Sequence, residues 1–324
     1  MAPIGIGLIG LGRHGMRYAR HLLEPLPNAR LTAVCRRTAA QGSAFAADHS
    51  VKFYEDYRDL IADSNVEAVV VVTPPSVTRP ICLEAVHARK PVLIEKPLAP
   101  TGAEAREMVR AAESYGTPLM TAQTLRFDSA VSALKAELAC VGPPQYLVLT
   151  NRVEPRAELT QSSADYAGRG VLLEIGIHLL DLIRFLTGEE VIEVRCDMDG
   201  SPPERPEFRA LVSLRTSGGL PCIVDVSRLT AGRISRAEWV GKNGQLLADW
   251  VSHRLSRISS HNRLDERTLE DRPTIVATIQ AFLDALGRGT PLPITGLDGQ
   301  RAVEIADACY QSAVTGQTVQ VGER

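Results

Sequence analysis

Two ionisable side chains on one predicted helix could transfer a proton during a reaction. Glu174 and His178 are four residues apart in an apolar helical pattern from about Val171 to Leu186, so they share one face of the helix. Histidine is the usual proton shuttle near neutral pH, and a carboxylate one turn away can orient its ring. Asp181 is a second candidate partner for the imidazole. The structural alternative is a helix histidine that local hydrogen bonds satisfy.

A lysine at the end of a predicted buried strand is a further candidate for acid/base chemistry. Lys96 follows the apolar run Val92–Ile94 and precedes Pro97, which stiffens the turn. Because ligands of open α/β sheets bind beyond the carboxyl ends of the strands, Lys96 can face a bound cofactor. Shielding from water would then lower its proton affinity. Many strand-end lysines are structural or solvated, so this alternative stays open.

A glycine-rich turn connects the first predicted strand, Ile4–Ile9, to the helical segment Met16–Leu23. The first glycine permits the tight turn, the second lets the backbone approach a pyrophosphate, and the third lets helix and strand pack closely. The anion would lie at the positive helix N-terminus. This order of strand, turn and helix predicts a dinucleotide site whose residues are Gly10, Gly12, Arg13, His14 and Gly15.

The end of the second predicted strand bears on the choice between NAD and NADP. An NAD enzyme usually carries an acidic residue there, which binds the ribose 2′-hydroxyl. This chain has Arg36, Arg37 and Thr38 instead. Two guanidinium groups and a hydroxyl can bind a 2′-phosphate, which favours NADP(H), although NAD(H) stays open and solvated arginines are the structural alternative.

The first part of the chain alternates short apolar runs with helical patterns. Runs that are continuously apolar indicate strands covered on both faces, and the segments between them are long enough for crossover helices. We therefore expect an α/β Rossmann domain with a doubly wound parallel sheet over residues 1–124. The expected strands are Ile4–Ile9, Leu31–Cys35, Ala68–Val72, Val92–Ile94 and Pro118–Thr121.

Residues 125–324 have a different pattern, typical of an α+β domain with an open, mostly antiparallel sheet. Alternating segments and glycine-containing turns predict hairpins. The last helix is expected to pack back on the first domain, and 251–272 is polar and irregular, a loop or an arm. The expected strands are Tyr146–Val153, Glu190–Asp197, Glu207–Arg215, Leu220–Arg228, Arg236–Val240, Gln245–Asp249 and Thr318–Val321; besides the helix named above, helices are expected at Asp271–Leu286 and Thr295–Ser312.

The composition excludes several other classes of protein. The chain has 36 basic and 38 acidic residues and a formal charge of −2, so it lacks the basic excess of a nucleic-acid binder. No apolar run is long enough to cross a bilayer, and the N-terminus has no signal-peptide pattern. Six isolated cysteines indicate reduced thiols and no zinc site. We expect a cytoplasmic protein without a metal, a membrane or a nucleic acid as partner.

Four motifs occur together in a fixed order, and this combination is specific. They are Gly-Leu-Ile-Gly-Leu-Gly (7–12), Val-Val-Val-Thr-Pro-Pro (70–75), Glu-Lys-Pro-Leu-Ala (95–99) and Gly-x-Gly-Val-Leu-Leu-Glu-Ile-Gly-Ile-His-Leu-Leu-Asp (168–181). Over nearly the whole chain, the sequence resembles the glucose–fructose oxidoreductase / inositol dehydrogenase / MocA-like (Gfo/Idh/MocA) family.

The resemblance implies a Rossmann domain followed by an open sheet whose outer face makes oligomer contacts, as a homodimer or homotetramer. It implies reversible oxidation of a secondary alcohol on a sugar, a cyclitol or a related polyol. Lys96 and His178 match the family's catalytic lysine and acid/base histidine. Four further positions match residues beside the cofactor: Thr73, Pro74, Pro75 and Glu95.

Three positions depart from the family pattern. Glu174 stands where the family often has Asp, Arg169 interrupts a usual glycine triplet, and Thr78 stands where His is frequent. The first two belong to the expected substrate pocket, so substrate identity stays open. Arginine suits the recognition of an anionic substrate; the candidate substrate residues are Arg126, Arg152, Arg156, Arg169 and Asp181.

The sequence therefore predicts an NAD(P)-dependent dehydrogenase or reductase. His178, helped by Lys96, would remove the hydroxyl proton while hydride passes to the nicotinamide. Two alternatives stay open: a nicotinamide-dependent glycosidase on the same fold, which would show no net change in cofactor absorbance, and a non-catalytic cofactor-sensing protein. The reaction direction and the oligomer size are not determined by the sequence.

Overall fold

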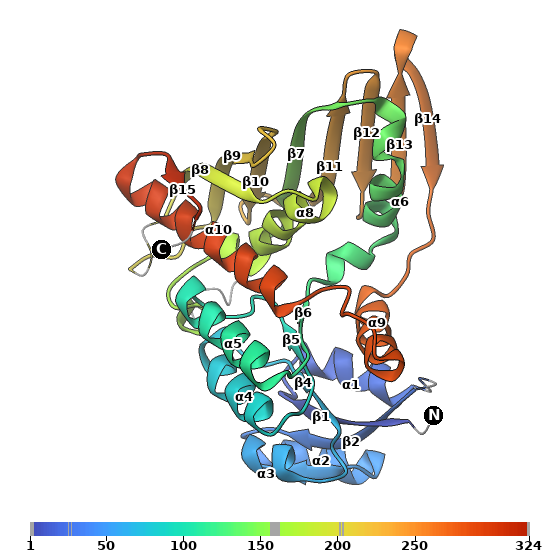
Figure 1. Cartoon of the computed structure of the whole chain (residues 1–324), viewed down its shortest axis with the longest axis vertical. Helices are drawn as coiled ribbons and strands as arrows, with labels where there is room; N and C mark the ends of the chain where they lie inside the picture. Colours follow the sequence, from blue (N-terminus) through green and yellow to red (C-terminus); the bar gives the residue numbers. More distant parts are fainter. Residues whose placement is uncertain are drawn as a thin grey trace. The chain divides into compact units, whose positions relative to one another are not determined.

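The structure is a computed structural model that describes residues 3–322, apart from 25, 27, 156–162, 201 and 203 (Figure 1). The chain forms two compact units. The first comprises the residues up to Gln123 together with Ile275–Gln300, and the second comprises Thr124–Thr274 together with the residues from Arg301 onward. Each unit has its own sheet, and the two are described separately below.

The sheet of the first unit has six parallel strands in the order β3-β2-β1-β4-β5-β6. All residues of β4 and β5 are buried, and all of them are apolar except Glu95 at the end of β5, as expected for a parallel sheet covered on both faces. The strand order reverses between β1 and β4, so the carboxyl ends of these two strands form the crevice in which such folds bind ligands. The strands are β1 (Ile4–Ile9), β2 (Ala29–Cys35), β3 (Lys52–Tyr54), β4 (Ala68–Val71), β5 (Val92–Glu95) and β6 (Leu119–Ala122).

Helices connect these strands, as the right-handed crossovers of a parallel sheet require. Local signals set the ends of α5, where the Thr101 side chain accepts the N–H of Glu104 at 3.3 Å and Gly116 ends the helix at a φ of 62°. The helices are α1 (Gly15–Leu23), α2 (Ala39–His49), α3 (Tyr57–Ala62), α4 (Pro75–His87) and α5 (Gly102–Tyr115); α9 (Thr274–Arg288) joins this unit from its second residue onward.

The second unit contains a nine-stranded mixed sheet in the order β14-β13-β12-β11-β7-β10-β9-β8-β15. Only β7 and β10 pair in parallel, and every other neighbouring pair is antiparallel. The strands are β7 (Pro144–Arg152), β8 (Val191–Met198), β9 (Arg209–Thr216), β10 (Pro221–Ser227), β11 (Ile234–Gly241), β12 (Gly244–Asp249), β13 (Arg254–Ser259), β14 (Arg263–Thr268) and β15 (Val319–Gln320).

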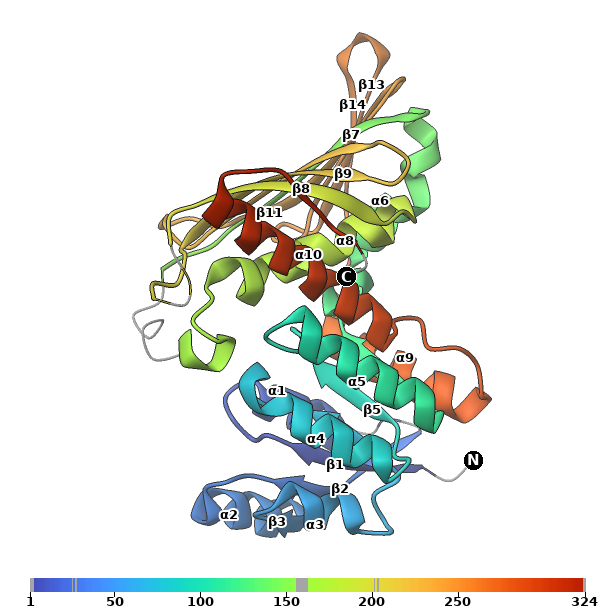
Figure 2. The same ribbon diagram turned by 60° about the vertical axis from the view of Figure 1, so that its left-hand side comes forward.

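Helices of the second unit cover one face of this sheet, and the other face carries none of the described helices (Figure 2). The burial pattern agrees, because β9 and β10 alternate between buried and exposed residues. The covering elements are α6 (Ser129–Glu137), the π-helical turn η4 (Leu172–Gly176), α8 (Ile177–Thr187) and the second-unit part of α10 (Gly296–Thr315); short 3₁₀ turns lie at η1 (Thr124–Phe127), η2 (Leu138–Val141), η3 (Ser163–Tyr166) and η5 (Ser260–Asn262).

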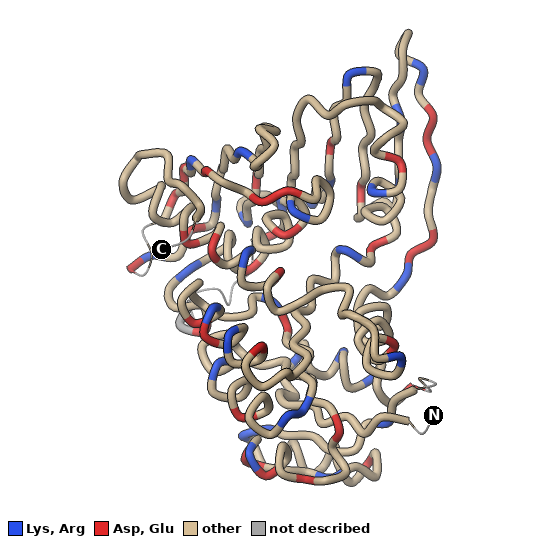
Figure 3. The backbone as a smooth tube through the Cα atoms, in the orientation of Figure 1, with Lys and Arg blue, Asp and Glu red and all other residues tan. Residues whose placement is uncertain are grey.

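The predicted fold class is confirmed, with three local corrections. The short strand β3 was not expected. The segment 251–272 is no irregular loop, because β13 and β14 form a hairpin that extends the sheet and carries basic and acidic side chains along its length (Figure 3). The helix expected from Val171 begins with the wider π turn of η4 before α8 continues it.

None of the helices in the described ranges has both the length and the hydropathy to cross a membrane. The six cysteines are all described and none forms a disulfide; five are buried, and Cys140 is exposed. Burial raises the pKa of the Cys82 thiol to about 12.

Candidate active site

The glycine-rich turn follows β1 at the point where the strand order reverses. Gly10 has a φ of 102°, and a Cβ there would lie 2.3 Å from the carbonyl oxygen of Val72, which follows β4. A Cβ on Gly15 would lie 1.8 Å from the carbonyl oxygen of Gly10. A Cβ on Gly12 would meet no atom within 4 Å. The first and third glycines therefore allow the backbone to pack, while the second faces open space.

This arrangement fits the pyrophosphate of a dinucleotide. The open space at Gly12 lets a ligand approach the main chain, and the first turn of α1 carries no acidic side chain that would repel an anion. The unpaired N–H groups and the dipole at a helix start favour a negative charge. Arg13 and His14, the predicted residues inside the turn, are both exposed.

A buried carboxylate connects the glycine-rich turn to the end of β5. Glu95 accepts hydrogen bonds from the hydroxyl of Tyr18 at 2.6 Å and from the backbone N–H of Lys96 at 2.9 Å, and it pairs with Nε2 of His14 at 2.8 Å. Burial alone would raise the pKa of Glu95, but the bond and charge of His14, the charge of Lys96 and the Tyr18 bond outweigh it and lower that pKa. Burial and the neighbouring Glu95 raise the pKa of Tyr18.

Lys96 lies half-buried directly after β5, at the carboxyl end of the sheet. Its backbone is fixed by Glu95, and the peptide bond to Pro97 is cis. Beyond the end of the neighbouring strand β4, Thr73 and Thr78 of α4 are joined through their hydroxyl groups at 3.1 Å, and Thr78 also donates to the carbonyl of Pro74. The predicted residues Thr73, Pro74 and Lys96 thus lie together at the carboxyl end of the first-unit sheet.

The arginines after β2 lie next to the same turn. Arg36 donates from Nη1 to the carbonyl oxygen of Leu11, inside the glycine-rich turn, at 2.5 Å. Arg37 and Thr38 are exposed. The structure therefore places a guanidinium group between the end of β2 and the turn.

In the second unit, Glu174 lies in η4 and His178 in the first turn of α8. Both side chains are half-buried. Arg228 donates to both carboxylate oxygens of Glu174, from Nε at 3.0 Å and from Nη2 at 2.8 Å. The arginine side chain is 4% exposed and also bonds the carbonyl of Glu154. Glu174 lies inside the π turn and His178 lies just after it. The regular α-helical spacing that was assumed from the sequence between these two residues therefore does not hold here.

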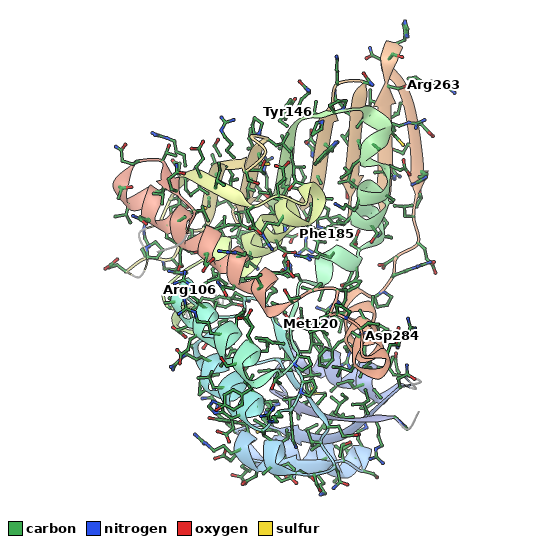
Figure 4. All side chains as sticks on the ribbon, viewed as in Figure 1. Arg106, Met120, Tyr146, Phe185, Arg263 and Asp284 are labelled. Atoms are coloured by element: carbon green, nitrogen blue, oxygen red, sulfur yellow. The ribbon has the colours of Figure 1, made fainter. Side chains whose placement is uncertain are left out.

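Asp181 and Arg126, both proposed to bind substrate, form a two-point ion pair. Arg126 donates from Nε at 2.7 Å and from Nη2 at 2.6 Å; the side chain of Arg126 is 9% exposed and that of Asp181 is 1% exposed. The guanidinium group also lies 5.3 Å from the ring centre of Phe185, which is labelled on α8 in Figure 4. The pair therefore anchors α8 to η1.

Two more of the candidate arginines, Arg152 and Arg169, also pair with aspartates. Arg152 bonds Asp225, and strand alternation places both on the face of the sheet opposite the helices, which does not favour a substrate contact for Arg152. Arg169 pairs with Asp307 at 2.6 Å. Arg156 lies outside the described residues.

Sequence reasoning missed three residues that hold these groups: Tyr18, Glu207 and Arg228. Two of them stand at the ends of the predicted strands Glu207–Arg215 and Leu220–Arg228, and all three are buried. A charged residue on the buried side of an alternating strand is the signal that could have identified Arg228, which continues the buried positions Cys222, Val224 and Val226. Alternation gives no such signal for Glu207, which has the parity of the outward-facing residues of β9. Among the described residues, no group of three or more His, Cys, Asp or Glu side chains could hold a metal ion.

The Rossmann-type sheet, the glycine-rich turn at its switch point and the anion-binding helix start define a dinucleotide-binding protein. Residues 4–123 match the model of an oxidoreductase family with an NAD-binding Rossmann fold, and residues 141–247 match the GFO/IDH/MocA C-terminal domain. The chain belongs to the Gfo/Idh/MocA family and is an NAD-binding oxidoreductase.

Relatives match the chain over nearly its full length. An inositol 2-dehydrogenase of Saccharopolyspora erythraea is 28% identical and covers 98% of this chain and 96% of its own. A myo-inositol 2-dehydrogenase of Thermotoga maritima is 28% identical and covers 98% of each chain. An oxidoreductase from Agrobacterium radiobacter, crystallised with NAD⁺, L-tartaric acid and magnesium, shares the fold with a TM-score of 0.88 at 23% identity, over 99% of each chain.

The contrast between two glycines of the turn predicts separable effects. We expect Gly12→Ala to leave the free energy of unfolding within about 0.5 kcal/mol of wild type, as for a surface substitution without new contacts, and to weaken cofactor binding at least about tenfold by blocking the ligand's approach. Gly15→Ala should lower stability as well, because its Cβ would overlap the Gly10 carbonyl. Urea denaturation and nicotinamide fluorescence titration measure the two effects. Tight binding by a folded Gly12→Ala protein would contradict the assignment.

Proposed function

We propose that this oxidoreductase interconverts a secondary alcohol and a carbonyl on a neutral sugar, cyclitol or related small polyol. The observation that carries the proposal is that, in each unit, a hydrogen-bonded carboxylate fixes the segment of one residue that we assign to proton transfer. Glu95 fixes the backbone of Lys96 in the first unit, and the Glu174–Arg228 pair anchors the helix of His178 in the second. The inositol dehydrogenases described above supply the substrate class.

The pairing of the arginines supports a neutral substrate. Arg126, Arg152 and Arg169 each donate to an aspartate within the second unit. A guanidinium group that is already paired has its charge balanced, and recognising an anion would require breaking that pair. A polyol needs only hydroxyl donors and acceptors, so it suits this charge arrangement better than a carboxylate or a phosphate.

The proton steps are assigned to two residues. His178 takes the proton from the hydroxyl group, and Lys96 donates a hydrogen bond to the same oxygen as it becomes a carbonyl; in reduction the roles reverse. Both oxygens of Glu174 accept from Arg228, so we assign Glu174 to positioning and not to proton transfer. The nicotinamide, when bound, supplies the hydride acceptor or donor.

Removal of either residue should slow turnover without loss of cofactor. We expect Lys96→Ala and His178→Ala to lower kcat by about 10²- to 10⁴-fold, the range for a general acid or base, with an unchanged Kd for the cofactor. Lys90→Ala and His253→Ala carry the same changes elsewhere in the two units and should retain kcat. The assay is a panel of sugars, cyclitols and ketones followed at the nicotinamide absorbance.

The same panel separates the alternative functions. Cleavage of a glycoside with no net absorbance change would identify a glycosidase. Cofactor binding without turnover on the whole panel would indicate a sensor. Near-wild-type turnover in both variants would refute the assignment of Lys96 and His178.

We further infer that the cofactor is preferentially NADP(H). The support is the pair of arginines, Arg36 and Arg37, where an acidic residue would bind the 2′-hydroxyl of NAD. The contact between Arg36 and the carbonyl of Leu11 keeps this guanidinium beside the glycine-rich turn. The Agrobacterium structure contains NAD⁺, so the preference has to be tested directly.

A single charge reversal should change the cofactor preference. Since a hydrogen bond to a charged group contributes about 1.5–3 kcal/mol, Arg36→Asp should lower the ratio of kcat/KM for NADP to that for NAD by about 10- to 100-fold. Arg110→Asp, the same change on the exposed face of α5, is the control. An unchanged ratio in Arg36→Asp would remove the basis for the NADP preference.

We also propose that the protein forms a homodimer or homotetramer through the uncovered face of the second-unit sheet. This face exposes large apolar side chains on several strands, for example 47% of Ile223. Figure 4 labels Tyr146 on β7, one of this group. The exposed apolar residues of the face are Tyr146, Leu211, Ile223 and Ile234.

Charge introduced on this face should dissociate the oligomer. The double variant Leu211→Lys/Ile223→Lys places two unpaired charges in the expected contact, so it should sediment at a lower mass than wild type at equal concentration. Val314→Lys changes an exposed residue of α10 and should keep the wild-type mass. A monomeric wild-type protein would overturn the proposal.

A further inference from the structure

The start of the helix that carries His178 is held by a buried carboxylate on a distant segment. The helix begins at Val171, and its first internal bond runs from the N–H of Glu174 to the carbonyl of Gly170. The four N–H groups before that bond have no partner inside the helix. They would be expected to find water, a capping side chain or a ligand.

Glu207 satisfies three of these four groups. Its Oε2 accepts the N–H of Gly170 at 2.9 Å, its backbone carbonyl accepts that of Val171 at 3.0 Å, and its Oε1 accepts that of Leu172 at 2.9 Å. A Cβ on Gly170 would lie 2.0 Å from the Glu207 carbonyl oxygen, so the close approach requires a glycine there.

Tyr310, on α10, holds the carboxylate itself. Its hydroxyl donates to Oε1 of Glu207, the oxygen that accepts the N–H of Leu172, at 2.8 Å. Its ring lies 4.6 Å from the guanidinium carbon of Arg169, the residue that precedes Gly170. Glu207 and Tyr310 are both buried, so water does not take over these bonds.

A buried carboxylate is an energetically unfavourable choice for a helix cap. Burial raises the pKa of Glu207, and the bonds from Leu172, Tyr310 and Gly170 oppose that shift without cancelling it. A serine or an asparagine could accept a capping bond without a buried charge. The carboxylate instead holds two N–H groups and a hydroxyl at once, which fixes the position of the helix start in space.

The π turn makes that position matter for His178. A π turn contains one residue more than an α turn, so relaxing it to an α turn would rotate the helix on one side by about 100° relative to the other. His178 lies just after η4, between the Glu207 contact and the Arg126–Asp181 pair. The chain must be fixed both at the Glu207 contact and at the Arg126–Asp181 pair for the imidazole of His178 to keep one direction.

We propose that Glu207, together with Tyr310, is a positioning residue for His178: it clamps the start of η4 and so maintains the π turn that sets the direction of the imidazole. This inference rests on the role of His178 in the proposed function. Misplacing a reacting group by 1 Å can lower a rate by about 10²-fold, so the clamp should affect turnover.

The central variant is Glu207→Gln. Its amide NH₂ replaces one oxygen that accepts a hydrogen bond from the helix start, so at least one of the bonds from Gly170 and Leu172 is lost. We expect faster amide hydrogen exchange over residues 170–173, a shifted NMR titration of the His178 ring and a kcat lowered by about 10- to 100-fold, the range for a misplaced catalytic group. The Kd of the cofactor, which binds the first unit, should not change.

Glu189→Gln is the matched control. Glu189 accepts the N–H of Gly218 and the hydroxyl of Thr216, so it holds a turn in a similar way at the other end of α8. It should leave exchange at 170–173, the His178 titration and kcat as in wild type. Equal effects of the two variants would show a general loss of stability and overturn the proposal.

A second variant and a comparison with wild-type turnover allow the positioning role of Glu207 to be tested in every case. If Glu207→Gln does not fold, Tyr310→Phe tests the same clamp: faster exchange at Leu172, whose N–H shares Oε1 of Glu207 with the Tyr310 hydroxyl, together with a shifted His178 titration supports it, and wild-type values of both refute it. If wild-type protein turns over no polyol, the proposed function fails, while exchange and the His178 titration still decide whether Glu207 positions the helix.

Discussion

A carboxylate taken out of water has to be surrounded by donors, and this requirement organises the surroundings of Lys96 and His178, the two residues proposed to transfer protons. In the first unit, Glu95 joins the start of α1 to the end of β5 through Tyr18, His14 and the backbone of Lys96. In the second, Glu207 joins the start of η4 to a strand and to α10. Each carboxylate fixes backbone from segments far apart in sequence, because its donors come from those segments.

Close approach of main chains is the second constraint, and glycine is what permits it. Gly10 and Gly15 allow β1, β4 and α1 to meet at the switch point, and Gly170 allows the carbonyl of Glu207 to reach the helix start. Gly12 differs, because its missing side chain leaves room for a ligand. Glycines of one motif therefore serve two different purposes, backbone packing at Gly10 and Gly15 and open space at Gly12, and the motif alone does not distinguish them.

The first unit was the easier one to predict because its signals are local. Strands such as β4 are short, continuous apolar runs, and the ends of α5 are set by Thr101 and Gly116 within the helix's own sequence. The strand β3 was missed because its three residues, Lys52–Tyr54, are too few to establish a period. The hairpin of β13 and β14 was missed because every residue of β14 is exposed, so the strand shows no alternation between apolar and polar residues.

The second unit was predicted less well at the level of side chains, because its determinants are pairs. Glu174 was assigned to orient His178 on the basis of helical spacing, but both of its oxygens accept from Arg228, which is 54 residues away. Arg126 and Asp181 were each predicted to bind a substrate, but in the structure they form an ion pair with each other. A sequence shows which side chains are charged, whereas only the fold shows which charges are balanced. Because Arg126, Arg152 and Arg169 are balanced in this way, the proposed function assigns discrimination between substrates to the arrangement of hydroxyl donors and acceptors. In the proposed function, that arrangement depends on the direction of α8, which is held by the Glu207 contacts before the helix and by the Arg126–Asp181 pair in its middle.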